Sequence, residues 1–178
     1  MSREKGVVMG RKNRIPDAVQ YESDAELRVS GRWDGGTVKA QDHNLCAAPL
    51  PLRAQVFAVL VVLMMRAKLD GPPDEEDEWQ NRGYVTAREI ANVATRVGGV
   101  DIAASQVAKL IHELRQELAK LWENSRAGKV WAWRLVQWKS GLGYRLSTHP
   151  SNLHLHLIRD LSQCETIPLP TCDGVVKF

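Results

Sequence analysis

Side chains that donate hydrogen bonds recur over residues 105–120 at intervals of three and four. This spacing places them on one face of an α-helix. The set comprises Ser105, Lys109, His112, Gln116 and Lys120, with Gln106 at its flank. Hydroxyl, amide, imidazole and ammonium groups are the donors that base edges and phosphate oxygens accept from. The stretch therefore predicts either a face that reads nucleic acid or an ordinary solvated helix face.

The opposite side of the same helix is apolar. Its core-facing residues are expected to be Ala104, Val107, Ile111, Leu114, Leu118 and Leu121. We expect the helix to run from Ile102 to about Trp122, with Asp101 as its N-cap. Glu113 and Glu117 lie near the donors, and each would repel a phosphate by roughly 1 kcal/mol if unpaired. For Arg115 two roles stay open, a contact to phosphate or a pair with an acid inside the domain.

Further donors follow in a predicted hairpin. We expect residues 130–138 to form its first strand, and Gly141 and Gly143 to make the tight turn. Lys139 then lies at the tip, and Arg134 and Arg145 lie on the strands. Tryptophans occur at 131, 133 and 138, the first two on one face of the strand and the third on the other. Core packing is the favoured role for these rings, and stacking on single-stranded bases is the alternative.

The elements before the donor-rich helix can also be predicted. Residues 25–48 alternate like a sheet, with a hairpin turn at Asp34-Gly35-Gly36. Pro49 and Pro51 are expected to open a helix over residues 52–67, which is apolar enough to be almost entirely buried. Thr86 and Glu89 form a capping-box pattern for a second helix, which Gly98-Gly99 ends near residue 97. A short turn then joins it to the donor-rich helix, as in a helix-turn-helix.

Charge is segregated along the 178 residues, although the net charge is only +3. Residues 1–16 hold five basic residues and one acid, and residues 102–148 hold eight basic residues and three acids. Residues 70–78 hold six acids and no base. We expect residues 1–20 to be a flexible basic arm, with DNA contact as an open alternative. The acidic segment lies in an expected loop over 69–83, either solvated or a protein contact.

Other classes of protein and site find less support. Three cysteines, Cys46, Cys164 and Cys172, are too sparse for a disulfide framework and suit a reducing cytoplasm. His154 and His156 match no standard zinc spacing with these cysteines, and an edge strand explains them equally well; residues 151–163 could instead form a short helix. No signal peptide, bilayer-length apolar run or enzyme motif is present. We therefore expect no catalytic site, metal site, cofactor or membrane contact.

The pattern of the long helix and hairpin resembles the OmpR/PhoB-type winged-helix family, the effector domain of many bacterial response regulators. The helix part is carried by Val107, Ile111, Leu114, Arg115 and Leu118. The hairpin part is carried by Gly141, Gly143, Tyr144, Arg145 and Leu146. The sheet expected before the first helix is a second point of resemblance. This chain departs from the family at Glu113, where a basic residue is common, and at Ser140, where arginine is common.

The resemblance implies an α+β fold: a winged helix-turn-helix with an N-terminal antiparallel β-sheet, a three-helix core and a C-terminal β-hairpin wing. We expect it to cover residues 21–149, with a C-terminal extension over 150–178. Only about 20 residues precede the first expected strand, so we expect no receiver domain. The implied function is sequence-specific binding of double-stranded DNA by a cytoplasmic transcriptional regulator, with no catalytic residue. Its predicted DNA-binding residues are Ser105, Gln106, Lys109, His112, Arg115, Gln116, Lys120, Arg134, Lys139 and Arg145.

Two alternatives stay open beside this interpretation. The same fold could serve as a protein-interaction module or scaffold subunit in a larger, nucleic-acid-handling complex, which the acidic residues and the missing tip arginine favour. The acidic segment 70–78 would then be one contact with a protein partner, and a second copy of the chain would be another class of partner. A protein that binds single strands through its tryptophans is the other alternative.

Overall fold

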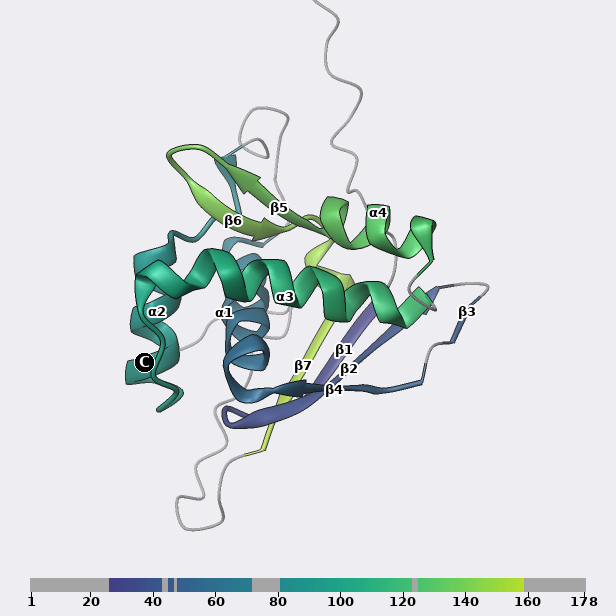
Figure 1. Ribbon diagram of the computed structural model, residues 1–178, viewed down its shortest axis with the longest axis horizontal. Coiled ribbons are helices and arrows are strands. Elements are labelled where there is room, and N and C mark those ends of the chain that lie inside the picture. The colour runs from purple at the N-terminus through teal and green to yellow at the C-terminus, as the bar shows by residue number, and fades with distance from the viewer. Residues whose placement is uncertain (1–25, 43–44, 47, 72–80, 123–124, 159–178) are drawn as a thin grey trace, which may run out of the picture.

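The computed structural model describes residues 26–42, 45–46, 48–71, 81–122 and 125–158. Within them, the chain forms an α+β fold with a sheet built mainly from the N-terminal strands, four α-helices and a two-stranded hairpin (Figure 1). The expected arm over 1–20, residues 72–78 of the acidic segment, and Cys164 and Cys172 lie outside the described residues. No helix within the described ranges is long and apolar enough to cross a bilayer.

The sheet begins with the hairpin expected from the sequence. Strands β1 (Glu26–Arg32) and β2 (Gly35–Asp42) pair antiparallel around a turn at residues 33–34. Strands β3 (Leu45–Cys46) and β4 (Leu50–Arg53) pair antiparallel with β2. Strand β7 (Leu153–Leu157) pairs with β1 in parallel. The sheet is therefore mixed, and the expectation of a purely antiparallel sheet was wrong at this edge.

Helix α1 (Ala54–Asp70) is the buried helix expected after the sheet, and every residue from Val56 to Met64 is buried. It starts later than predicted, because Pro51 lies in β4 rather than in the first helical turn. The ring of Phe57 packs directly on the backbone of Gly36, where any side chain would collide with it. The glycine after the turn thus lets α1 approach the sheet closely.

Helix α2 (Ala87–Arg96) begins with the predicted capping box of Thr86 and Glu89, which is confirmed. Gly99 follows the helix with a positive φ of 64°, as expected for a residue that ends it. The predicted cap of the next helix was wrong. A 3-10 turn over Ala104–Gln106 precedes α3 (Val107–Ala119), and the side chain of Gln106 accepts a hydrogen bond from the Ala103 amide.

Residues 126–135 form a helix, α4 (Arg126–Leu135), and not the start of a strand as predicted. The side chain of Ser125 caps it by accepting from the Gly128 amide. Its buried residues, Gly128, Ala132 and Leu135, recur at helical spacing. A Cβ at Gly128 would crowd the Ala119 carbonyl and Trp122, so this glycine allows α4 to lie close to the end of α3.

The expected hairpin is present but shorter. Strands β5 (Val136–Lys139) and β6 (Gly143–Leu146) pair antiparallel. In Figure 1, α3 crosses in front of α1, with the large sheet on one side and the hairpin and α4 on the other. Helix α1 packs against α2, α3, β2 and β6, so one core serves all of these elements.

Candidate nucleic-acid interface

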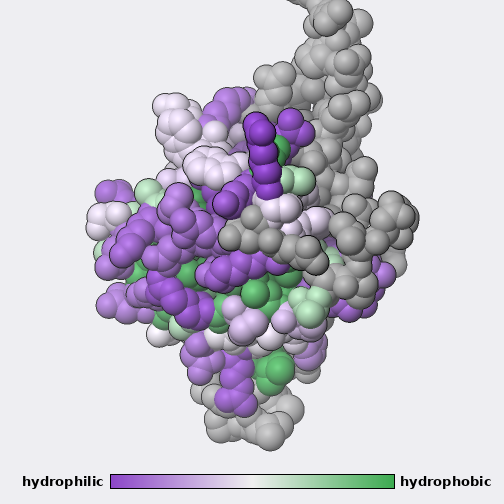
Figure 2. All heavy atoms as spheres, turned by 45° about the vertical axis from the view of Figure 1, so that its right-hand side comes forward, coloured by the Kyte–Doolittle hydropathy of each residue, from purple (hydrophilic) through white to green (hydrophobic). Residues whose placement is uncertain are grey.

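Helix α3 presents the polar face that the sequence predicts. Within the helix, Val107, Ile111, Leu114 and Leu118 are buried. Two residues expected on the buried side differ: Ala104 is exposed in the 3-10 turn, and Leu121 is only partly buried. The six predicted donors along this segment are all exposed: Ser105, Gln106, Lys109, His112, Gln116 and Lys120. In Figure 2, hydrophilic side chains cover much of the side of the molecule in view, with smaller apolar areas between them.

Both glutamates on α3 are paired with cations. Glu113 forms an ion pair with Arg53, which stands where β4 joins α1. Glu117 pairs with Lys120, with a nitrogen–oxygen distance of 2.7 Å. These pairs are partly exposed and therefore add little stability. Their effect is electrostatic: the carboxylates repel an approaching phosphate less, and the charge of Lys120 is partly balanced.

Arg115 takes neither of the two roles left open for it. It is 9% exposed, and its Nε and Nη2 donate to the main-chain carbonyl of Val136, at 3.0 and 2.6 Å. The ring of Trp133 covers the guanidinium, with 3.9 Å between Arg115 Cζ and the ring centroid. Burial lowers the pKa of Arg115, because it disfavours the charged form. Arg115 therefore ties α3 to the start of β5.

The three basic residues predicted in the hairpin lie in different settings. Lys139 is on β5, and its Nζ donates to Asn81 Oδ1 at 2.9 Å. Arg145 is buried under the hairpin, where Nε donates to Gln137 Oε1 at 2.9 Å and the guanidinium lies 4.6 Å from the Tyr84 ring centroid. Arg134 is exposed on α4 rather than on a strand. Of the three, only Lys139 lies in the hairpin and is not buried.

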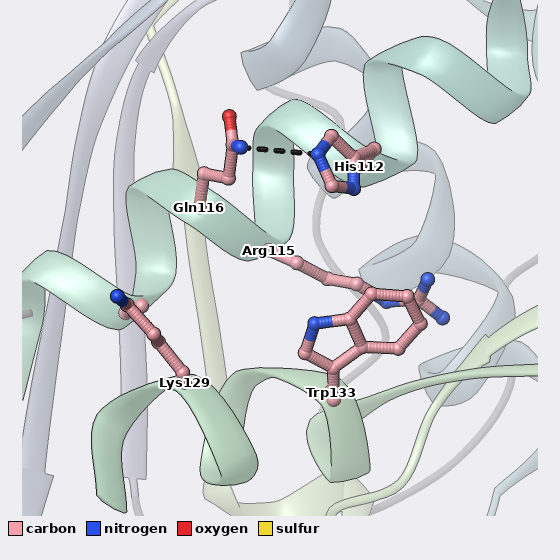
Figure 3. Close-up of a pocket in the computed structure, with 6 residues that line it drawn as sticks. His112, Arg115, Gln116, Lys129 and Trp133 are labelled. Carbon is pink, nitrogen blue, oxygen red and sulfur yellow. Dashed lines mark hydrogen bonds between the residues drawn. The ribbon is translucent and has the colours of Figure 1, made fainter. Parts of the chain in front are cut away.

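A pocket of about 260 Å³ lies between α3 and α4. Its lining residues are His112, Arg115, Gln116, Ala119, Lys129 and Trp133. Figure 3 shows His112 and Gln116 on α3 above, joined by a 3.0 Å contact, and Lys129 and Trp133 rising from α4 below. The predicted DNA-binding residues did not include Lys129 and Trp133, although their spacing of four residues would place them on one helix face.

The tryptophans divide between packing and exposure. Trp131 is partly buried and packs on Trp122, with ring centroids 3.8 Å apart. Trp133 is 55% exposed and Trp138 61% exposed. Core packing is thus confirmed for Trp131 and wrong for the other two. The exposed rings lie on α4 and β5.

The histidines near the C-terminus belong to an edge strand. His154 and His156 are exposed on β7, and His154 Nε2 lies 2.8 Å from Glu26 Oε1 on the neighbouring strand. The edge-strand interpretation of this segment is therefore confirmed over residues 153–157, rather than a helix. Within the described ranges, no three side chains of the metal-ligating types gather in one place.

No protein-family model, curated protein or solved structure matches this chain. The resemblance to the OmpR/PhoB-type family therefore rests on the residues of α3 and of the hairpin and on the sheet that precedes the first helix.

Proposed function

We propose that this protein is a sequence-specific, duplex-DNA-binding protein of winged helix-turn-helix type, acting as a transcriptional regulator. The observation that carries the proposal is the exposed polar face that runs from the 3-10 turn before α3, along α3, to Lys120, and that carries six exposed donor side chains. This face follows α2 through a short turn, and a β-hairpin comes later in the same domain. A helix of this kind enters the major groove in helix-turn-helix proteins.

Roles can be assigned by side-chain chemistry. Lys109 supplies a point charge for a phosphate, and Lys139 supplies another from the hairpin. Ser105 and Gln106 can exchange hydrogen bonds with base edges, which is the source of sequence preference. Pairing of Glu113 and Glu117 with cations supports the proposal, because unpaired carboxylates on this face would oppose binding.

The family resemblance supports the same proposal but leaves differences. Helix α4 stands between the proposed reading helix and the hairpin, so the core has four helices where the resemblance implies three. Arg115 and Arg145, which match the family motifs, are buried and bonded inside the domain. In this chain they support the fold of the proposed surface, and the contacts to DNA fall to the exposed donors.

The test is a titration of the full chain against random-sequence and selected duplexes at several salt concentrations. Affinity should fall with salt, with a log–log slope near −0.9 for each phosphate contacted. Lys109→Ala should weaken binding by roughly 1–3 kcal/mol and leave the melting temperature unchanged. The matched control is Lys39→Ala, which removes the same charge from β2, in the large sheet, and should change neither quantity.

Absence of binding to any duplex at low salt would refute the proposal. If Lys109→Ala and Lys39→Ala lower duplex affinity equally, the binding is nonspecific charge attraction and not recognition by the polar face of α3. A large fall in melting temperature for Lys109→Ala would contradict the exposed position of this side chain.

A second candidate is a protein-interaction module, favoured by the exposed apolar side chains of α4 and β5. Val130, Trp133 and Trp138 are 46%, 55% and 61% exposed. Exposed aromatic rings are enriched in protein interfaces. Replacing Trp138 with Ser should leave duplex affinity unchanged if the ring serves a protein partner. Sedimentation of the chain alone measures its oligomeric state: a dimer would identify a second copy as the partner, and a monomer would favour another protein.

A further inference from the structure

The described residues that line the pocket between α3 and α4 include several hydrogen-bond donors. His112 and Gln116 come from α3, and Lys129 and Trp133 from α4. Among the described residues, no aspartate or glutamate contributes to the lining. The two glutamates of α3 are held by Arg53 and Lys120. A concave site with cationic and neutral donors and without carboxylates suits an oxyanion.

Two donors of the pocket have no acceptor in the described part of the chain. Lys129 is exposed and forms no ion pair there, and the indole nitrogen of Trp133 donates no hydrogen bond there. In Figure 3 the Lys129 ammonium and the Trp133 ring nitrogen both project into the space between the two helices. Both donors can therefore serve an anion that enters the pocket.

A fixed positive charge stands behind the pocket. The guanidinium of Arg115 is 9% exposed, lies against the ring of Trp133, and bonds a neutral carbonyl. No carboxylate pairs with it among the described residues. A buried cation without a counter-ion attracts an anion to its vicinity more strongly than an exposed one, because water screens it less. The charge therefore adds to that of Lys129.

We propose that this pocket binds a phosphate group, with Lys129 and the Trp133 indole as donors and Arg115 as the electrostatic support. The pocket, of about 260 Å³, is large enough to admit a phosphate group. Two sources can supply the group: the backbone of a duplex that lies on α3, or a small phosphorylated molecule. The first source rests on the proposed function, whereas the second does not.

The first experiment titrates the full chain with inorganic phosphate and follows the indole N–H resonance of Trp133 by NMR, assigned through Trp133→Phe. The resonance should shift and saturate at millimolar phosphate, and sodium chloride of equal ionic strength should not reproduce the shift. Lys129→Gln should weaken binding at least roughly tenfold, the effect of losing one charged donor. The matched control Arg126→Gln removes the charge of a residue that lines a different pocket, and it should change phosphate binding less than twofold.

The same resonance then distinguishes the two sources. A short duplex that shifts it and competes with phosphate identifies the ligand as a backbone phosphate. Phosphate binding without any duplex binding supports a small-molecule site while the proposed function fails. Duplex binding that leaves the resonance unmoved, together with no response to phosphate, overturns this inference and leaves the proposed function intact. A chloride response equal to that of phosphate, or equal losses in both variants, also overturns it.

Discussion

Replacing Arg115 tests whether this residue supports the domain or contacts DNA. Its Nε and Nη2 share one acceptor, the Val136 carbonyl, and the Trp133 ring covers its guanidinium. A buried hydrogen bond from a charged donor contributes about 1.5–3 kcal/mol, and a cation–π contact at a half-exposed ring about 0.5–1 kcal/mol. Removing the buried cation offsets part of this, because no carboxylate in the described part of the chain compensates its desolvation. The net cost of Arg115→Ala is therefore about 2–3 kcal/mol.

The assay pairs urea unfolding with duplex affinity at fixed salt. Arg115→Ala should lower the free energy of unfolding by this amount. Arg115→Lys keeps the charge but loses the planar fork and the stacking, so it should still cost about 1–2 kcal/mol. Lys109→Ala is the matched comparison, because it should lower affinity and leave stability unchanged. Ordinary surface substitutions change stability by about 0.5 kcal/mol or less. If Arg115→Ala changes stability by no more than this, and lowers duplex affinity as much as Lys109→Ala does, then Arg115 contacts DNA and the reasoning is refuted.

Three further predictions concern the hairpin, the start of α2 and the polar face of α3. Gly143→Ala should lower the free energy of unfolding by about 2 kcal/mol or more, because the added Cβ would overlap the Val85 carbonyl. Gly141 also has a positive φ but open space around it, so Gly141→Ala, the control, should cost only about 1 kcal/mol. Hydrogen bonds from the N-cap residue Thr86 lower the pKa of Glu89 from its usual 4.5. Glu89→Gln should therefore lower the free energy of unfolding by a few tenths of a kcal/mol at neutral pH, measured by urea titration. This difference should disappear as the pH falls through the folded-state pKa, because the carboxylate is then protonated. Glu113→Gln should strengthen duplex binding about two- to fivefold at low salt and hardly at all at high salt, measured by anisotropy.

The features that the sequence could predict are those set by neighbours along the chain. The phase of α3 follows from the apolar spacing of Val107, Ile111, Leu114 and Leu118. The start of α2 follows from a capping pattern that spans four residues, and the β1–β2 hairpin from a glycine-containing turn. In each case the signal lies within a few residues of the element it specifies.

Helix α4 was missed because its residues fit two periods at once. Trp131 and Trp133, together with Val130, are residue types common in strands, and their spacing of two suits a sheet. Gly128, Ala132 and Leu135 recur at steps of four and three, which is the spacing that the structure uses. Small residues at the buried positions gave a weak apolar signal, so the larger rings dominated the prediction.

The role of Arg115 and the place of β7 depend on contacts between distant segments. The acceptor of Arg115 is a main-chain carbonyl 21 residues away, and a main-chain group leaves no mark in the sequence. Strand β7 pairs in parallel with β1, from the other end of the described chain. Alternation within Leu153–Leu157 indicates a strand, but it does not say which partner the strand chooses.

The position of α4 limits how a duplex can approach α3. The major groove is about 12 Å wide and admits one helix. Two packed helices lie about 8–10 Å apart between their axes, so α3 and α4 together are too wide to enter it side by side. His112 and Gln116 already face the pocket shared with α4. The part free to enter the groove is therefore the N-terminal half of α3, with Lys109, and the 3-10 turn before it, with Ser105 and Gln106. The pocket would then meet the sugar–phosphate backbone at the edge of the groove, where a phosphate site is useful.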